Sequence, residues 1–345
     1  MANFWNNKNV FITGGNGFLG SHVVAELVRH GARPVVLIYE ENPGGIFEKE
    51  NYAKRATVVR GDIRNLALIE ELLRWHHIDT VFHLAAQAIV DQAIDDPLDT
   101  FEVNIQGTWN ILEACKRNPS IERIIVASSD KAYGNHDNLP YEEHTHHLKA
   151  AYPYEVSKAA ADLITQTFAK TFHIPVCITR CANLYGPGDM KMNRLIPRTI
   201  YQLHPKQPPV VRDTGSSLRD YLYVADAAEG YRILAEQMDE SMHGEAFNFS
   251  TNTPLSVAEV IKLISREMKK QIKPKIIKTH GMEIRHQYAS FDKAKRLLGW
   301  KPRHNFTDGL KKTIPWYIDH IEKSYANVIQ DVKPTLGKSQ KVVRK

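Results

Sequence analysis

Short apolar runs alternate with longer amphipathic segments through the first half of this chain of 345 residues. The runs are rich in Val and Ile, which is typical of strands buried on both faces of a parallel sheet. Between them, apolar residues recur with the period of a helix. The alternation predicts an α/β fold, a doubly wound parallel sheet with right-handed crossovers. The predicted strands are 10–13, 35–39, 57–59, 81–84, 124–128 and 176–179, and the predicted helices are 18–30, 66–75, 100–116 and 154–172.

The pattern changes at about residue 181, where Pro and Gly become frequent and longer loops join helical segments at 224–238 and 257–269. This half is predicted to form a smaller α/β lid over the carboxyl ends of the strands, where open α/β sheets bind ligands. We therefore expect the main boundary near residue 180, with the possibility that pieces of the second half cross back to the first.

The composition is that of a soluble globular protein, because 43% of the residues are hydrophobic. No apolar run reaches the roughly 18 residues of a membrane span, and the polar N-terminal segment lacks the apolar block of a signal peptide. Cys115, Cys177 and Cys181 cannot all pair, and their apolar settings favour core thiols in a reducing compartment. We expect a cytosolic protein without a membrane partner.

Basic residues concentrate at the C-terminus, where residues 326–345 carry most of the net charge of +6. The absence of interleaved aromatic residues favours a solvated, flexible tail over a nucleic-acid-binding arm. His144, His146 and His147 have a spacing that suits a metal, but no carboxylate-rich shell accompanies them. We expect neither a nucleic-acid partner nor a metal.

A glycine series follows the first predicted strand and opens the first long helix. Residues 13–20 read Thr-Gly-Gly-Asn-Gly-Phe-Leu-Gly, so Gly14, Gly17 and Gly20 recur every three residues. Glycines permit a tight turn and a close approach of the backbone to a pyrophosphate, which then lies on the helix N-terminus. With a strand before it and a helix after it, the series predicts a dinucleotide site rather than a simple turn.

Acidic residues follow the second and third predicted strands. Glu40 stands 20 residues beyond Gly20, where a carboxylate can hold both ribose hydroxyls and repel a 2′-phosphate, which favours NAD over NADP. Tyr39 is the alternative for the aligned position. Asp62 can accept from the adenine amino group, or it can cap the helix that follows.

Tyr154 and Lys158 stand four residues apart in a predicted helix, so they lie on one face. The ammonium is expected to lower the pKa of the phenol, which makes Tyr154 a base for oxidation of an alcohol by NAD. The alternative is an ordinary aromatic residue at a helix start.

Asp130 and Lys131 follow the fifth predicted strand at its carboxyl end, where a site is expected. An acid and an amine beside a redox pair can add an elimination to the oxidation. The alternative for these two residues is a solvated surface ion pair.

Motifs along nearly the whole chain resemble those of the extended short-chain dehydrogenases/reductases. Within that superfamily the chain is most similar to the nucleotide-sugar 4,6-dehydratases, and among these to the CDP-glucose enzymes. The triplet 129–131 is Ser-Asp-Lys, whereas the dTDP-glucose enzymes have a second carboxylate in place of Lys131. The motifs are the glycine loop, 61–63, 83–87, 129–131, Tyr154 with Lys158, 180–187, 194–197, 219–224 and 298–302.

The resemblance implies the domains and the site residues. Residues 1–180 are expected to form a Rossmann-like NAD-binding domain with the catalytic residues, 181–325 a nucleotide-sugar-binding domain, and 326–345 the tail. The implied catalytic residues are Ser129, Asp130, Lys131, Tyr154 and Lys158. The implied NAD-binding residues are Gly14, Asn16, Gly17, Phe18, Leu19, Gly20, Glu40, Asp62, Ile63, Leu84, Ala85, Ala86, Tyr154 and Lys158. The implied substrate-binding residues are Gln87, Asn183, Arg194, Leu195 and Arg219.

The implied reaction is dehydration of CDP-glucose or a UDP-linked hexose to the 4-keto-6-deoxy sugar. It proceeds by oxidation at C4, loss of water across C5 and C6, and hydride return to C6. The helices at 100–116 and from 154 onward resemble those that pair in the family's dimers, so a homodimer is expected.

Two other functions share part of this pattern. A nucleotide-sugar 4-epimerase uses NAD, Tyr154 and Lys158 but needs no acid or amine at C5 and C6. A non-catalytic NAD-binding protein is the other alternative, and an intact Tyr154 and Lys158 argue against it.

Overall fold

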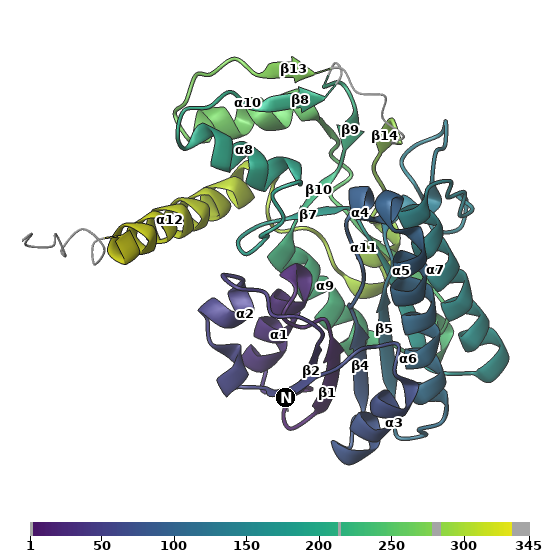
Figure 1. Ribbon diagram of the computed structural model, residues 1–345. Coiled ribbons are helices and arrows are strands. Elements are labelled where there is room, and N and C mark those ends of the chain that lie inside the picture. Colours follow the sequence, from purple (N-terminus) through teal and green to yellow (C-terminus); the bar gives the residue numbers. More distant parts are fainter. Residues whose placement is uncertain (1–2, 213–214, 278–283, 333–345) are drawn as a thin grey trace, which may run out of the picture.

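The computed structural model describes residues 3–212, 215–277 and 284–332 (Figure 1). Its centre is a parallel sheet of seven strands in the order β11-β6-β5-β4-β1-β2-β3. The chain builds the sheet outward from β1 to β3 and then crosses to β4 on the other side of β1. The switch point between β1 and β4 is where a doubly wound sheet binds its ligand. The strands are β1 (Asn9–Thr13), β2 (Arg33–Ile38), β3 (Thr57–Arg60), β4 (Thr80–His83), β5 (Arg123–Ala127), β6 (Val176–Cys181) and β11 (Ala246–Phe249).

Helices cover both faces of the sheet (Figure 1). On one face α1 packs beside α9, and on the other α3, α6 and α7 lie side by side. These and the neighbouring helical segments are α1 (Phe18–Arg29), α2 (Ile46–Lys49), η1 (Tyr52–Lys54), α3 (Leu66–Trp75), α4 (Val90–Asp95), α5 (Pro97–Phe101), η2 (Glu102–Gln106), α6 (Gly107–Lys116), η3 (Asp130–Tyr133), α7 (Pro153–Phe172), α9 (Val224–Gln237), η4 (Glu240–Met242) and α11 (Asp292–Leu298).

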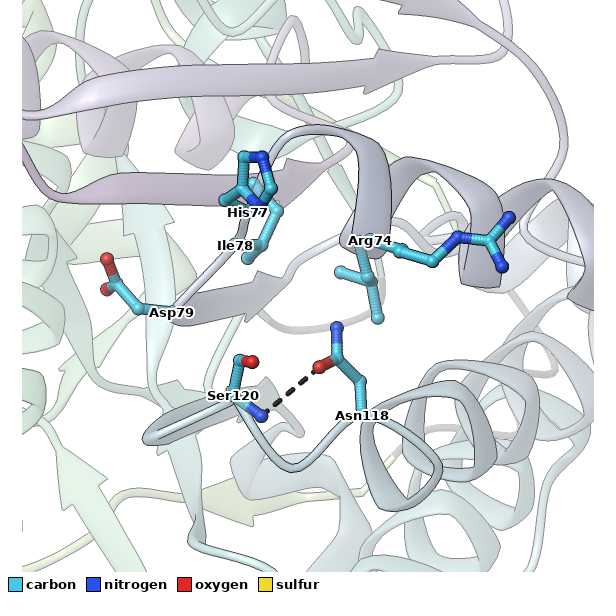
Figure 2. Close-up of a pocket in the computed structure, with 7 residues that line it drawn as sticks. Arg74, His77, Ile78, Asp79, Asn118 and Ser120 are labelled. Carbon is cyan, nitrogen blue, oxygen red and sulfur yellow. Dashed lines mark hydrogen bonds between the residues drawn. The ribbon is translucent and has the colours of Figure 1, made fainter.

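A cavity of about 200 Å³ opens where α3 and α6 end, at the amino ends of β4 and β5 (Figure 2). Its lining includes Arg74, His77 and Asp79. Ligands of such sheets bind at the opposite, carboxyl ends of the strands. This cavity therefore lies away from the switch point and from the residues predicted to be catalytic.

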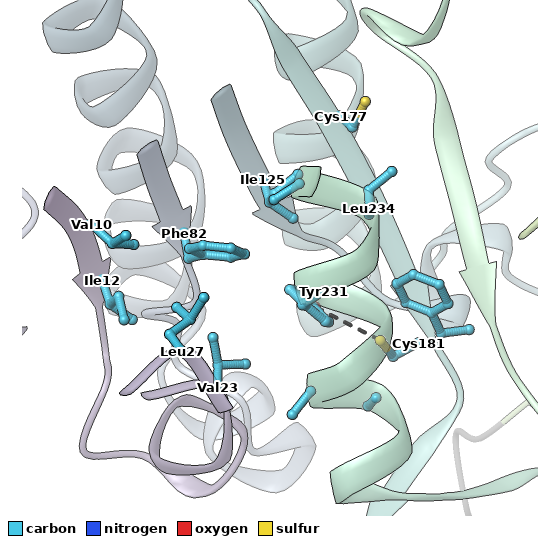
Figure 3. Packing of buried hydrophobic residues seen from close by; sticks show 14 of the residues in the cluster. Val10, Ile12, Val23, Leu27, Phe82, Ile125, Cys177, Cys181, Tyr231 and Leu234 are labelled. Atoms are coloured by element: carbon cyan, nitrogen blue, oxygen red, sulfur yellow. Dashed lines mark hydrogen bonds between the residues drawn. The ribbon is translucent and has the colours of Figure 1, made fainter. Parts of the chain in front are cut away.

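Alternate residues of β1 face the two layers of helices. Val10 and Ile12 pack into the core formed with α1 and α9, where Leu27 and Tyr231 lie (Figure 3). Phe11, between them, packs into the second core with α3 and α6. This two-sided burial explains why the strands read as continuous apolar runs.

The second half of the chain builds a smaller unit over one end of the sheet (Figure 1). Ile196, Ile200 and Leu310 belong to its separate core. The second half also supplies β11, α9 and α11 to the sheet. The elements of the smaller unit are β7 (Asn183–Tyr185), α8 (Leu195–Leu203), β8 (Val210–Arg212), β9 (Leu218–Arg219), β10 (Tyr221–Tyr223), β12 (Leu255–Ser256), α10 (Val257–Glu267), β13 (Lys275–Ile277), β14 (His286–Gln287) and α12 (Phe306–Val332).

The six predicted strands and most predicted helices are confirmed, with bounds that differ by one or two residues. The helix predicted at 100–116 is interrupted, because a π-helical turn, η2, separates α5 from α6. Asn104 in this turn donates to the Gln87 carbonyl oxygen and accepts from the Gln87 backbone N–H, so a side chain ties the turn to the loop after β4. Of the expected tail, 326–332 belong to α12 and 333–345 lie outside the described residues.

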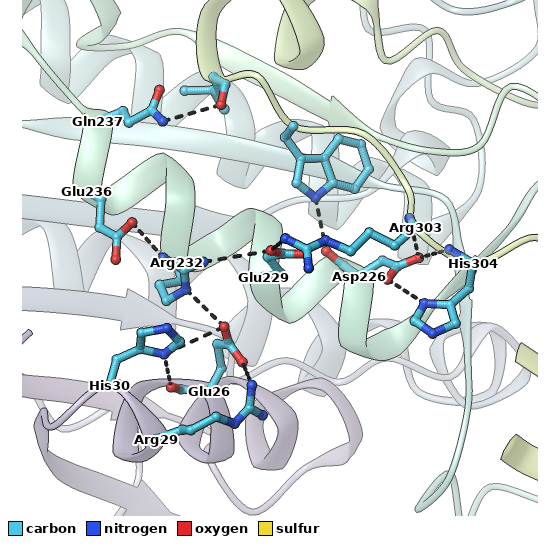
Figure 4. Close-up of polar contacts among 12 residues, drawn as sticks. Glu26, Arg29, His30, Asp226, Glu229, Arg232, Glu236, Gln237, Arg303 and His304 are labelled. Atoms are coloured by element: carbon cyan, nitrogen blue, oxygen red, sulfur yellow. Dashed lines mark hydrogen bonds and ion pairs between the residues drawn. The ribbon is translucent and has the colours of Figure 1, made fainter.

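An ionic cluster joins α1 to α9 (Figure 4). The Glu26 carboxylate accepts from Arg29 at 2.6 Å and from Arg232 at 2.9 Å. Arg232 also donates to Glu236 at 2.6 Å.

In the ranges that the structure describes, no helix is both long and apolar enough to cross a membrane.

Candidate active site

The glycine loop between β1 and α1 is shaped for close approach. Gly14 has φ +66°, and a Cβ there would lie 2.8 Å from the Cα of Ala85. A Cβ on Gly20 would overlap the Gly14 carbonyl oxygen. Gly17 is the N-cap of α1, and no side chain of the described residues caps this helix end. The N-terminus of α1 thus keeps backbone donors and a positive dipole end for an anion, so these residues fit the pyrophosphate of NAD.

Thr13 and His83 clamp β1 to β4 at the switch point. Thr13 Oγ1 lies 2.8 Å from His83 Nδ1 and accepts from the backbone N–H groups of Leu84 and Ala85 at 3.1 Å. Burial, and then the charge of Lys158, lower the pKa of His83 to about 3, so the imidazole is neutral. The clamp holds Leu84 and Ala85, both predicted to bind NAD, beside the glycine loop. Sequence reasoning used the motif at 83–87 but did not identify this role of His83.

The residues predicted to bind the ribose lie in the loop after β2. The Glu40 side chain is exposed, and the backbone carbonyl oxygen of Glu40 accepts from Asn16 Nδ2 at 2.7 Å. Asn42 Nδ2 donates to the carbonyl oxygen of Asn16 at 2.9 Å. These bonds fix the loop that carries Glu40 to the glycine loop.

Asp62 does not cap the helix after β3. Asn65 is the N-cap of α3, and its side chain accepts from the Leu68 N–H. Asp62 accepts instead from Arg64, at 2.8 Å from the backbone N–H and 2.9 Å from Nε. Ile63 is buried against Gly107. The capping alternative for Asp62 is therefore wrong.

Tyr154 and Lys158 lie buried in the first two turns of α7. Lys158 Nζ donates to the Ala127 carbonyl oxygen at the end of β5, at 2.9 Å. Burial raises the pKa of Tyr154 to about 12, although the charge of Arg194 and a hydrogen bond with Ser129 act in the opposite direction. Burial also lowers the pKa of Lys158 to about 8. The expected lowering of the Tyr154 pKa by Lys158 is thus wrong for the protein alone, because desolvation of the phenolate dominates.

Asp130 and Lys131 turn inward from η3, directly after β5. Asp130 is only 2% exposed, so it does not belong to a solvated surface pair and that alternative is wrong. Burial raises the pKa of Asp130 to about 6, opposed by the charge of Lys131 and assisted by that of Asp220. Ser129 Oγ donates to Asp130 Oδ1 at 3.3 Å, whereas Oδ2 has no hydrogen-bond partner in the described part of the chain.

Lys131 reaches a residue that sequence reasoning missed. Its Nζ donates to Oε1 of Gln287, in β14, at 3.2 Å. The two residues are 156 positions apart. No local pattern in the sequence marks Gln287, so only the tertiary contact identifies it.

The predicted substrate residues Asn183 and Arg219 gather near Asp220. Asn183 Nδ2 donates to the Asp220 carbonyl oxygen at 3.3 Å. Arg219 is buried and donates to the carbonyl oxygens of Leu218 and Arg285 at 2.9 and 3.1 Å. Its charge also opposes the rise that burial causes in the pKa of Asp130. The structure thus brings these residues close to the acid after β5.

Arg194, in the smaller unit, lies near the predicted base Tyr154. It is the N-cap residue of α8, where Leu195 is the first helical residue. Its Nη1 lies 3.1 Å from Asp189 Oδ1, and its charge lowers the pKa of Tyr154. Arg194 therefore lies within electrostatic reach of the predicted base.

Gln87 is turned into the protein. Its Nε2 donates to the Ile89 carbonyl oxygen at 3.1 Å and to Thr100 Oγ1 at 2.9 Å, and its Oε1 accepts from the Ile89 N–H. A contact of Gln87 with the sugar stays a prediction.

Within the described ranges, no group of three or more His, Cys, Asp or Glu could hold a metal ion.

Comparison with known proteins gives a match over most of the chain. Residues 10–250 match the model of the NAD dependent epimerase/dehydratase family. The dTDP-glucose 4,6-dehydratase of Escherichia coli is 31% identical over 347 residues, which cover 91% of this chain and 94% of that enzyme. A trifunctional enzyme of Arabidopsis thaliana, UDP-glucose 4,6-dehydratase/UDP-4-keto-6-deoxy-D-glucose 3,5-epimerase/UDP-4-keto-L-rhamnose-reductase RHM2, is 31% identical over 326 residues. That match covers 91% of this chain but only 48% of the plant enzyme.

An epimerase is also among the similar solved structures. The UDP-glucuronic acid 4-epimerase of Bacillus cereus, in complex with UDP-glucuronic acid and NAD, superposes with a TM-score of 0.83. It has 25% sequence identity over 90% of this chain and 99% of that one. The match thus extends to both reaction types.

Proposed function

The chain belongs to the NAD-dependent epimerase/dehydratase family, with NAD as its cofactor, and we propose that it dehydrates a nucleotide-linked hexose to the 4-keto-6-deoxy sugar. The substrate is CDP-glucose or a UDP-linked hexose. The observation that carries this proposal is that Asp130 is buried within electrostatic reach of Tyr154, while the adjacent Lys131 contacts the buried Gln287. A 4-epimerase has no use for an acid and an amine at C5 and C6. The 31% identity to a dTDP-glucose 4,6-dehydratase supports the same reaction type.

Tyr154 serves as the base in the first stage. It removes the O4 proton of the hexose, and Ser129, which bonds Tyr154, is placed to accept or donate at the same oxygen. NAD held by the glycine loop would supply the oxidant for C4 and, once reduced, the hydride for C6, and Lys131 then returns its proton to C5. The positive charge of an oxidised nicotinamide bound there would favour the phenolate of Tyr154 and oppose the effect of burial.

Lys131 and Asp130 carry out the elimination. The 4-ketone acidifies the C5 proton, which moves to Lys131 when its amine is unprotonated. The electrons of the C5–H bond form the C5–C6 double bond, and the C6–O6 bond breaks. The Asp130 proton moves to O6, so the leaving group departs as water. A carboxyl group whose pKa is raised to about 6 by burial keeps a protonated fraction near neutral pH.

We propose a division of labour that follows the expected domains. Residues 1–180 hold NAD and the catalytic groups, and 181–325 hold the nucleotide sugar. Arg219 is assigned to the diphosphate, because a guanidinium binds phosphate oxygens in a bidentate manner, and Arg194 and Leu195 are assigned to the nucleotide.

A homodimer through α6 and α7 is part of the proposal. Trp109, Leu163 and Phe172 on these helices are 43%, 53% and 45% exposed. Such apolar side chains on neighbouring helices suit a helical interface between two copies of the chain. Sedimentation of Leu163→Glu measures its dimerisation, which should be weaker than that of wild type. A dimer as tight as that of wild type would contradict an interface through α6 and α7.

Mass spectrometry after incubation with CDP-, UDP-, dTDP- and GDP-hexoses tests the reaction. Dehydration removes the mass of one water, whereas epimerisation conserves mass. Lys131→Met is expected to retain C4 oxidation, seen as bound NADH, and to stop water loss. Lys149→Met, an exposed lysine of the following loop, is the matched control. Full turnover by Lys131→Met would remove Lys131 from the mechanism, and a product of unchanged mass would favour the epimerase.

A further inference from the structure

Gln287 is a fully buried amide at the edge of the candidate active site. It is 0% exposed, and its Oε1 accepts from Lys131 Nζ at 3.2 Å. Its Nε2 has no hydrogen-bond partner among the described residues. A buried donor without a partner destabilises the folded state, so an apolar residue of similar size would suit a purely structural position better. The contact with Lys131 is the feature of Gln287 that an apolar residue cannot supply.

The backbone on both sides of Gln287 is fixed. The Gln287 carbonyl oxygen accepts from the Asp220 N–H at 3.2 Å, in the pairing of β14 with β9. The next residue, Tyr288, accepts from the Tyr141 N–H at 2.9 Å, and Ser290 donates to the Tyr141 carbonyl oxygen at 2.9 Å. Two neighbouring segments therefore hold the backbone that carries the Gln287 side chain, whose Oε1 accepts from Lys131.

We propose that Gln287 is the positioning residue for Lys131, fixing its Nζ for proton removal from C5 of the substrate. This inference rests on the proposed dehydration and assigns a task within it to a residue from the second half of the chain. Gln287 does not touch the reacting atoms in this assignment and acts only through Lys131.

A neutral amide suits this task better than a carboxylate. The amide oxygen accepts a hydrogen bond from either the amine or the ammonium form of lysine, so it orients Nζ without holding its proton. When Nζ takes the C5 proton, the same bond becomes charge-assisted and stronger. The carboxyl groups that face Lys131 are Asp130 and Glu155; burial raises the pKa of both, and the charge of Lys131 opposes this rise. A third carboxylate at position 287 would favour the ammonium further.

Gln287→Leu and Gln287→Glu test the proposal in the full-length protein. With the nucleotide hexose found active, Gln287→Leu should form bound NADH within about twofold of wild type. It should lose water and incorporate solvent deuterium at C5 about 100-fold more slowly, as for a misplaced catalytic group. Gln287→Glu keeps the acceptor, so its activity should exceed that of Gln287→Leu, with its optimum at higher pH.

Asn248→Leu is the matched control. Asn248 is another fully buried amide, which accepts from Tyr133 and donates to the Tyr141 carbonyl oxygen without contacting Lys131. It should keep the wild-type ratio of C4 oxidation to water loss. A general weakening of the fold would slow C4 oxidation and water loss equally. If Gln287→Leu slows both steps equally, or slows neither, the positioning role is wrong.

A second measurement needs no turnover. Acetic anhydride labels neutral amines, and mass spectrometry of the peptide that contains Lys131 gives the pH at which labelling is half-maximal. This pH should rise in Gln287→Glu, and labelling should become faster in Gln287→Leu, while the other lysines serve as internal references. Equal labelling in all variants would overturn the role of Gln287. Absence of any dehydration by wild type would instead overturn the proposed function, and the labelling would then decide the contact by itself.

Discussion

Two buried aspartates of this protein have opposite surroundings. Asp162, in α7, accepts from Arg180 Nε at 2.8 Å and Nη2 at 2.9 Å, and from Gln166 at 2.8 Å. Asp130, after β5, has one bond of 3.3 Å from Ser129 and a second oxygen without a partner in the described residues. Both are at most 2% exposed.

The difference separates a structural charge from a reactive one. A buried carboxylate with a bidentate arginine is stabilised as an anion and loses its capacity to exchange protons. A buried carboxyl group with few donors has a raised pKa and can carry a proton near neutral pH. The chain thus uses full pairing in α7 and incomplete pairing at the carboxyl end of β5.

The largest expected effect is the loss of the structural pair. Asp162→Asn leaves the Arg180 guanidinium buried without a counter-charge and should lower the free energy of unfolding by about 3–5 kcal/mol. Urea denaturation at pH 7 measures this. Asp95→Asn, at an exposed carboxylate of α4, should change stability little. A stability of Asp162→Asn equal to that of Asp95→Asn would contradict the structural assignment.

The next effect is the pH dependence of stability at Asp130. Burial raises the pKa of this group from 3.8 to about 6, so the folded state binds more protons than the unfolded state between these values. The contribution of Asp130 to stability therefore falls as pH rises from about 4 to 6 and stays low above. Asp130→Asn does not titrate at this position. Its free energy of unfolding, relative to that of wild type, should therefore rise by about 3 kcal/mol as pH goes from 4 to 7.

Urea denaturation of Asp130→Asn and wild type across this range provides the measurement. Asp95→Asn serves again as the control, because an exposed carboxylate should give a difference that does not change with pH. If the difference in free energy of unfolding between Asp130→Asn and wild type does not change with pH, burial does not raise the pKa of Asp130.

A smaller effect, about 100-fold in rate or about 2.7 kcal/mol in activation free energy, is expected for catalysis by Asp130→Asn. The amide cannot give a proton to O6, so water loss should slow while C4 oxidation continues. Mass spectrometry of the product and absorbance of bound NADH separate the two steps. Equal loss of both would indicate that Asp130 positions the substrate rather than acting as the acid.

The smallest effect concerns the cluster between α1 and α9. Glu26→Gln leaves Arg232 with its bond to Glu236, so the free energy of unfolding should fall by only about 1 kcal/mol. Thermal unfolding in low and high salt checks this, since the loss should shrink as salt screens the wild-type pairs. A loss as large as that of Asp162→Asn would mean that partly exposed and fully buried pairs do not differ here.

Much of the sheet was predictable because its signals are local. The strands of the first half are apolar runs buried on two faces, and the glycine loop has a spacing that few other structures require. β11 was not predicted, because Ala246–Phe249 comes after a long excursion of the chain and joins the sheet only through its pairing with β6. The π-helical turn before α6 was missed for a similar reason, since its Asn104 bonds Gln87, a residue outside the helix.

The sequence by itself determined the doubly wound sheet and the phosphate loop, because each depends on periodicity or on spacing within one turn or helix. It also indicated the candidate catalytic residues of the first half, through their places at strand and helix ends and through the family resemblance. Only the tertiary structure decided how these groups are charged and held. Burial sets the raised pKa of Asp130 and of Tyr154, and Gln287 reaches Lys131 from a strand 156 residues away. Desolvation and long-range contacts depend on what surrounds a side chain, and the surroundings of a residue are assembled from distant parts of the chain.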